Sequence, residues 1–126
     1  MTLPATASFR SLCRSFPVPH ELEVEDWACW AEPDANHPDV AFIHLGVDQT
    51  SDDPARVWLP RFDQTIELLV KAGIGWFLLE PFPGGAWLCG ELKIGAGLRL
   101  DKGRYGIASS KEEAAYRLLL DLVAQP

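Results

Sequence analysis

The segment from Ser110 to Val123 constrains the fold more than any other part of this chain. Glu113 follows Ser110 by three positions, the spacing of a capping box in which a hydroxyl and a carboxylate each satisfy a free backbone N–H at a helix start. The apolar residues that follow recur at helical spacing: Ala115, Leu118, Leu119, Leu122 and Val123. The sequence therefore predicts a C-terminal helix with one apolar face, which a sheet must cover.

A second helix is predicted over residues 58–73. Pro60 suits its first turn, and Gly73 suits the left-handed residue that follows a helix end. Its expected buried stripe consists of Phe62, Ile66, Leu69 and Val70.

Antiparallel strands are predicted between these two helices. Residues 75–81 and 86–94 are apolar runs on either side of Phe-Pro-Gly-Gly, which is typical of a hairpin turn. The shorter runs 98–100 and 104–108 are separated by Asp-Lys-Gly and predict a second, shorter hairpin.

The first twenty residues predict a helix. Its apolar stripe has the spacing i, i+3, i+4 and i+7, and Pro17 and Pro19 end it. The stripe consists of Phe9, Leu12, Cys13 and Phe16. The same residues hold two arginines, several Ser and Thr and no carboxylate, so a targeting segment is the alternative interpretation.

Two further segments carry strand patterns. Residues 20–33 fit the alternation of a half-buried strand and also fit a helix, and we favour the strand. Residues 40–47 are β-branched and apolar on both faces, which predicts a buried strand.

These elements predict an α+β fold, an antiparallel sheet with helices packed on it, in the order α-β-β-α-β-β-β-α. The length of 126 residues suits a single domain with its own core. Within it we expect an N-terminal helix and acidic strand and loop segment at 1–57, and an α-β-β-β-α unit at 58–126.

Negative charge is confined to one segment of the chain. The formal net charge is −7, yet residues 21–55 contain ten Asp and Glu and neither Lys nor Arg. Residues 1–20 carry +2, and residues 56–126 hold nine basic and eight acidic side chains. Such a segment steers association with a basic partner and repels the phosphates of nucleic acids. The alternative is that these carboxylates only solvate a face of the protein.

The order of elements in residues 58–126 resembles the double-stranded-RNA-binding domain. Ser110 and Lys111 match the start of that family's last helix, and Ala114 matches the small residue inside it. The second lysine of the motif is Glu112 here and the last is Ala115, and the first hairpin loop lacks the family's histidine. The resemblance implies a shared topology, whereas the missing lysines disfavour direct binding of RNA.

Residues 58–123 also resemble the phage ABA-sandwich domain family. Three features carry this resemblance: a Pro-x-aromatic helix start, Trp-containing strands, and a Ser-rich step into an Ala- and Leu-rich helix. The matching residues are Pro60, Phe62, Trp76, Trp87, Ala108, Ser109, Ser110, Ala114 and Ala115. The family's Tyr-Ser/Thr-x-Asp is Phe-Asp-Gln-Thr here, a departure in order. The resemblance implies a fold and a phage or prophage origin, and it transfers no catalytic residues.

The sequence contains no recognisable catalytic or cofactor motif. Cys13, Cys29 and Cys89 are far apart and form no metal-binding pair, so we expect packed thiols in a reducing, cytoplasmic compartment. His44 lies in an apolar run and is expected in the core. Asp48 and its neighbours lack the glycine of a calcium loop. We therefore predict no enzyme activity, no cofactor and no metal, with an enzyme of unrecognised site as one alternative.

The leading hypothesis is a small protein that binds another protein through the acidic segment. Tryptophans among carboxylates are typical of such surfaces. The partner is expected to be basic, such as a nucleic-acid-binding protein. No apolar run approaches the roughly 20 residues that span a membrane. Self-association is left open, as is an RNA-binding-like module with degenerate contacts. The expected partner-binding residues are Glu21, Glu23, Glu25, Asp26, Trp27 and Trp30.

Overall fold

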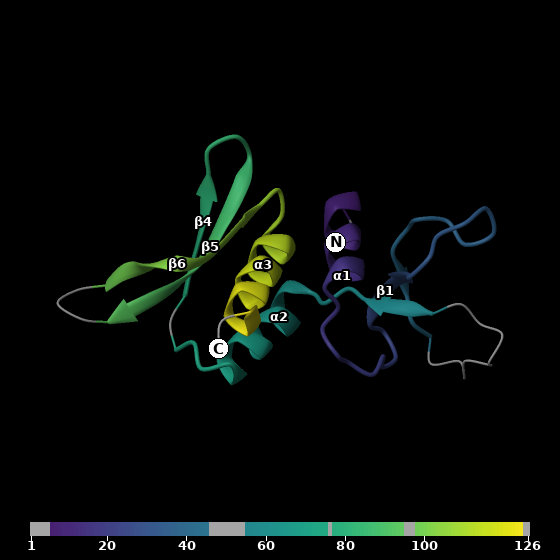
Figure 1. Cartoon of the computed structure of the whole chain (residues 1–126), viewed down its shortest axis with the longest axis horizontal. Helices are drawn as coiled ribbons and strands as arrows, with labels where there is room; N and C mark the ends of the chain where they lie inside the picture. Colours follow the sequence, from purple (N-terminus) through teal and green to yellow (C-terminus); the bar gives the residue numbers. More distant parts are fainter. Residues whose placement is uncertain (1–5, 46–54, 76, 95–97, 125–126) are drawn as a thin grey trace. The chain divides into compact units, whose positions relative to one another are not determined.

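Contacts within the chain concentrate in two units, Met1–Arg61 and Phe62–Pro126, here called unit 1 and unit 2 (Figure 1). The computed structural model describes residues 6–45, 55–75, 77–94 and 98–124. The boundary lies four residues after the division expected at 57/58, and the single domain stays a prediction.

The α+β class is confirmed, with three helices and two antiparallel three-stranded sheets among the described residues. The observed order is α-β-β-β-α-β-β-β-α, one strand more than expected. The additional strand is β3, Arg56–Trp58, so Trp58 does not begin the second helix. Pro60 explains the difference, because a proline disfavours helical backbone at the residue before it.

Unit 1 begins with α1, Ala7–Ser15, as the apolar spacing predicted. The Thr6 hydroxyl accepts a hydrogen bond from the Phe9 N–H at 3.1 Å and caps the helix. Phe9 and Cys13 are fully buried, whereas Phe16 lies past the helix end and is 59 % exposed.

The sheet of unit 1 has the strand order β2-β1-β3. β1 is Trp27–Trp30, and it pairs with β2, Phe42–Ile43, on one side and with β3 on the other. Ala28 and Cys29 are both fully buried, so the centre of β1 is covered on both faces rather than alternating between core and solvent.

The prediction of a buried strand over residues 40–47 was wrong for the part that the structure describes. β2 contains two residues, and Val40, Ile43 and Leu45 are all exposed. Because β2 is an edge strand, only alternate side chains such as Phe42 and His44 turn inward. Residues 46 and 47 lie outside the described residues.

Unit 2 begins with α2, Phe62–Lys71. Its buried residues are Thr65 and Leu69, whereas Val70, expected in the stripe, is 57 % exposed. Gly73 follows the helix with a φ of 106°, the left-handed conformation predicted for it.

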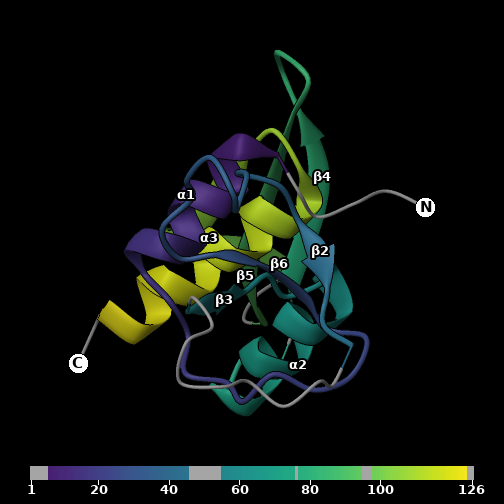
Figure 2. The ribbon, with the colours of Figure 1, turned by 90° about the vertical axis from the view of Figure 1, so that its right-hand side faces the viewer.

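The predicted first hairpin is present. β4, Phe77–Phe82, pairs antiparallel with β5, Ala86–Ile94, and Gly84 and Gly85 both have positive φ in the turn. The turn end of the hairpin reaches beyond the first turn of α3, away from the C-terminus (Figure 2).

The predicted second hairpin was wrong. Residues 98–108 form one strand, β6, Leu98–Ala108, which pairs with β5. Gly90 pairs with Tyr105 and Leu92 pairs with Leu100, so Glu91 alone stands opposite four residues of β6. The Asp-Lys-Gly signal therefore marks a bulge inside a strand rather than a turn between two strands.

The C-terminal helix α3, Lys111–Ala124, packs on β5 and β6, as the sequence predicted. Ala115, Leu118 and Leu119 of the expected face are buried, whereas Val123, near the helix end, is 71 % exposed. The Ser110 hydroxyl accepts a hydrogen bond from the Glu113 N–H at 3.2 Å. Gly106 lies directly under the helix, and a Cβ built on it would stand 2.2 Å from the Ala114 carbonyl oxygen. The close approach of helix and sheet therefore requires glycine at this position.

Candidate functional site

The first three carboxylates of the acidic segment lie at the surface. Glu21, Glu23 and Glu25 are exposed, and they precede β1. The Glu23 carbonyl accepts a hydrogen bond from the Asp26 N–H at 3.1 Å, which closes a turn over Val24 and Glu25. Val24 is 64 % exposed, so the turn presents an aliphatic side chain between two carboxylates. We call residues 21–25 the acidic turn.

Glu25 has an unusual backbone conformation. Its φ is 75°, in the left-handed region that favours glycine. A positive φ at the third position of a tight turn is the type II arrangement, in which glycine or asparagine is the usual residue. Glutamate in this position costs roughly 1 kcal/mol relative to glycine.

A bulge in the strand ladder fixes this conformation. The Glu25 N–H donates to the His44 carbonyl, and the His44 N–H donates to the Asp26 carbonyl, both at 2.8 Å. Glu25 and Asp26 therefore both stand opposite the single residue His44, which is the definition of a β-bulge. In one class of bulge the first of the two residues, here Glu25, has a left-handed conformation. The acidic turn is thus anchored to β2 by the backbone.

Asp26 lies in the interior, although it was expected in the partner-binding set. It is 4 % exposed, and its Oδ2 accepts hydrogen bonds from the Glu23 N–H at 2.9 Å and from His20 Nε2 at 2.8 Å. The His20 ring stacks on Trp58 with 3.7 Å between centroids. Asp26 therefore holds the acidic turn in place and does not present its charge to solvent.

The side chains of the two tryptophans expected to anchor a partner are mostly covered by the protein itself. Trp27 is 9 % exposed. Trp30 is partly exposed and packs against His37 and Phe42. The Arg56 guanidinium lies 5.2 Å from the Trp30 ring centroid, a cation–π distance. Trp30 thus contacts a cation from outside the acidic segment, and its rings hold the sheet and the following loop together.

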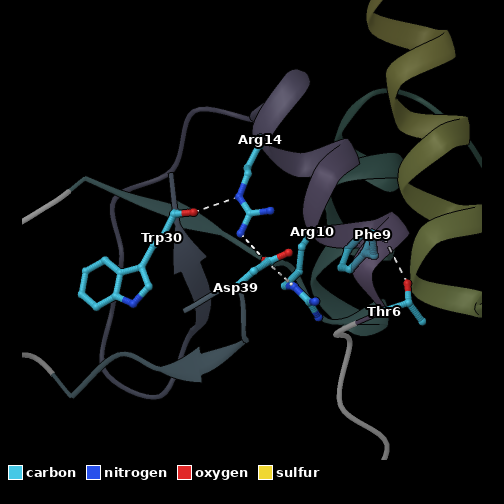
Figure 3. A network of polar contacts seen from close by, with 6 residues as sticks. All are labelled: Thr6, Phe9, Arg10, Arg14, Trp30 and Asp39. Carbon is cyan, nitrogen blue, oxygen red and sulfur yellow. Dashed lines mark hydrogen bonds and ion pairs between the residues drawn. The ribbon is translucent and has the colours of Figure 1, made fainter. Parts of the chain in front are cut away.

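Asp39 is paired with two arginines of α1. Its Oδ1 accepts hydrogen bonds from Arg10 Nε at 2.8 Å and from Arg14 Nη2 (Figure 3). The hydrogen bonds from Arg14 and then Arg10 lower the pKa of Asp39 to about 2. Arg14 also donates through Nε to the Trp30 carbonyl at 2.8 Å, so the group ties α1 to β1.

The remaining carboxylates of the segment differ in their environment. Asp34 accepts hydrogen bonds from the backbone N–H groups of Asn36 and His37, and these bonds, with the Asn36 bond largest, lower the pKa of Asp34. Glu32 is exposed. Asp48, Asp52 and Asp53 lie outside the described residues.

The three cysteines and His44 lie in the core. All three cysteines are buried, and burial raises the pKa of Cys29 and raises that of Cys89 to about 11, which disfavours the thiolate. His44 is 7 % exposed, and its Nδ1 accepts a hydrogen bond from Arg56 at 2.9 Å. Within the described ranges, His, Cys, Asp and Glu form no group of three that could hold a metal ion.

The lysine at the start of α3 is exposed and lies near a tryptophan of the sheet. Lys111 Nζ lies 4.9 Å from the Trp87 ring centroid, and Glu113 is 2 % exposed and accepts hydrogen bonds from Arg117. The position that corresponds to an RNA-contacting lysine in the resemblance thus packs on a tryptophan of the sheet.

Comparisons with models of known families, with curated proteins and with solved structures find no match to this chain. Among the helices in the described ranges, none has the length and apolar character that crossing a membrane requires.

Sequence reasoning found the carboxylates of the acidic turn but missed its organisation. The exposed Val24 and the left-handed Glu25 carry no sequence signal, because the turn lacks the glycine or asparagine that normally marks such a position. His20, six residues before Asp26, was the one available indication of an internal partner.

Proposed function

We propose that this protein binds another protein of basic character through the acidic turn. The observation that carries the proposal is the backbone of Glu25, which holds an exposed glutamate at a φ of 75° where glycine would be more stable. Local strain of this kind clusters at binding and catalytic sites, since the surrounding structure must maintain it.

The surroundings of the turn support a preorganised binding surface. The Asp26 side chain, its His20 partner and the backbone bonds to His44 fix the turn, so little conformational entropy is lost when a partner binds. The exposed Val24 between Glu23 and Glu25 offers apolar contact inside a negative field. A partner with lysines or arginines around an apolar contact fits this arrangement.

The proposal is narrower than the sequence suggested. It rests on Glu21, Glu23, Val24 and Glu25, while Asp26 and the tryptophans support the surface from within. A nucleic-acid-binding protein is one partner with the required charge, because its basic surface is built for phosphates. The phage origin, the cytoplasmic location and the absence of enzyme activity stay predictions.

Capture from cell extract at low salt tests the proposal. The test variant changes Glu21, Glu23 and Glu25 to glutamine. The control variant changes three other exposed glutamates, Glu32, Glu67 and Glu80, to glutamine. It therefore has the same net charge as the test variant. We expect one basic protein to bind wild type and control but not the test variant. Equal capture by all three proteins, or equal loss in both variants, would contradict the proposal.

A single substitution separates function from stability. Glu25→Gly removes the carboxylate and relaxes the backbone, so we expect it to raise the free energy of unfolding by about 1 kcal/mol and to weaken capture. Glu25→Gln should weaken capture without this stabilisation. A Glu25→Gly variant that is less stable than wild type would show that the glutamate is retained for structural reasons.

Titration of labelled duplex RNA at low salt tests the alternative of an RNA-binding module. We expect negligible binding, because unit 1 is acidic and Glu112 and Ala115 stand where the RNA-binding motif has its second and last lysines. Tight and strongly salt-dependent binding would contradict the proposed function.

A further inference from the structure

The sheet of unit 2 is covered differently on its two faces. Cys89 and Gly106 pair with one another, and the place of Gly106 under Ala114 shows that their face is the one that meets α3. α2 packs against α3 and not against the other face of the sheet (Figure 1). Since side chains alternate along a strand, Leu88 and its neighbours point away from both helices of unit 2.

This second face, here called the open face, is almost entirely apolar. Phe82 is 39 % exposed and Tyr105 is 46 % exposed, unusual for aromatic side chains. Glu80, whose strand position also faces this way, is charged and exposed. The apolar residues of the open face are Leu78, Phe82, Ala86, Leu88, Leu92, Tyr105 and Ile107. Leu88, at the centre, is 7 % exposed, so the exposed apolar surface of this face lies around Phe82 and Tyr105.

The size of the open face agrees with a weak sheet-on-sheet interface. A nine-residue strand extends about 30 Å and three strands span about 14 Å, which gives about 400 Å² on each side. The total area buried by two such faces is smaller than that of a standard stable complex. An interface of this size is typical of a weak, reversible dimer.

The charge of unit 2 also favours a second copy as the occupant. Residues 62–126 hold seven basic and eight acidic side chains, whereas residues 1–61 hold four basic and ten acidic. Contact between two nearly neutral units costs little electrostatic repulsion, although each whole chain carries −7. Two-fold symmetry would place the same apolar residues of both copies against one another, as in an isologous interface.

We propose that two copies of this chain associate through the open face, with the sheets about 10 Å apart and the strands of the two copies roughly aligned. The resulting layers in the two units 2 are helix, sheet, sheet and helix. This interface belongs to unit 2 and includes none of the residues of the acidic turn.

Sedimentation velocity over a range of concentrations tests the proposal. For wild type we expect the average mass to rise from the monomer value of 14.0 kDa toward twice that value between about 10 µM and 1 mM. The rise should persist or strengthen when salt is raised from about 0.05 M to about 0.5 M, because salt screens the repulsion between acidic chains. A monomer at every concentration overturns the proposal, as does a dimer that salt dissociates.

Two variants and a control locate the interface. Tyr105→Glu and Phe82→Glu each place a charge on the open face at an exposed position, and each should weaken dimerisation at least tenfold. Val123→Glu changes a side chain of α3 that is 71 % exposed and should leave the mass curve unchanged. Circular dichroism verifies that each variant is folded. Folded Tyr105→Glu and Phe82→Glu proteins with the wild-type curve, or an equal loss in Val123→Glu, overturn the assignment.

Discussion

Gly106 offers the most direct test of how unit 2 is built. Replacing it with alanine adds one methyl group, which would stand 2.2 Å from the Ala114 carbonyl oxygen, 2.8 Å from Arg117 Cβ and 2.9 Å from the Leu118 nitrogen. Two of these three atoms belong to the backbone of α3, so a side-chain rotation cannot relieve the contact. The helix must move away from β6 by about 1 Å to restore ordinary van der Waals distances.

The expected cost follows from the packing that this movement disturbs. Ala114, Ala115 and Leu118 are fully buried against the sheet, and overpacking in such a core costs about 1–3 kcal/mol. Alanine also restricts the unfolded chain, which offsets about 0.4–1 kcal/mol. We therefore expect Gly106→Ala to lower the free energy of unfolding by about 1–2 kcal/mol and the melting temperature by about 4–8 °C.

Urea denaturation followed by circular dichroism measures this change. Gly75→Ala is the matched control, because no atom lies within 4 Å of its added Cβ and its φ is not positive. That variant should be unchanged or slightly more stable. A Gly106→Ala protein that loses less than about 0.5 kcal/mol would refute the close packing of α3 on β6.

Three further predictions follow from individual contacts. Because Arg14 and Arg10 lower the pKa of Asp39 to about 2, below its value in the unfolded chain, its ion pair stabilises the fold above about pH 4. That contribution is lost as the pH falls through 2. In urea denaturation, Asp39→Asn should cost at most about 1 kcal/mol at pH 7, given solvent screening, and almost nothing at about pH 1. Cys89, whose pKa is raised to about 11 by burial, should resist a thiol reagent at pH 8 in the native state and react in urea; rapid native labelling would contradict its burial. Ser110→Ala removes the cap of α3 and should destabilise the protein by about 1 kcal/mol, whereas Ser110→Asp should retain most of the stability.

Elements with local signals could be predicted from the sequence. The cap at Ser110, the glycines of the first hairpin turn and the prolines after α1 each act within a few residues, and each element was found at the expected place. The prediction of a second hairpin was wrong because it also relied on a local signal: Asp-Lys-Gly has the composition of a turn. Only the long-range pairing of β6 with β5 shows that this segment is a bulge.

The sheet of unit 1 could not be predicted in the same way. Its strands contain four, two and three residues, so their existence depends on pairing across the chain and on packing around Trp30 rather than on propensity. The sequence also does not show which carboxylates are paired. Asp39 is paired with Arg10, 29 positions away, and no local pattern distinguishes it from the exposed Glu25.

The division of the chain after Arg61 has a consequence for its biosynthesis. Every contact internal to unit 1 joins residues that the ribosome has already linked before it begins unit 2. At about 5–20 residues per second, the following 65 residues take roughly 3–13 s to add, which is long compared with the folding time of most small domains. The nascent polypeptide can therefore acquire its negatively charged surface while the second half is still being translated.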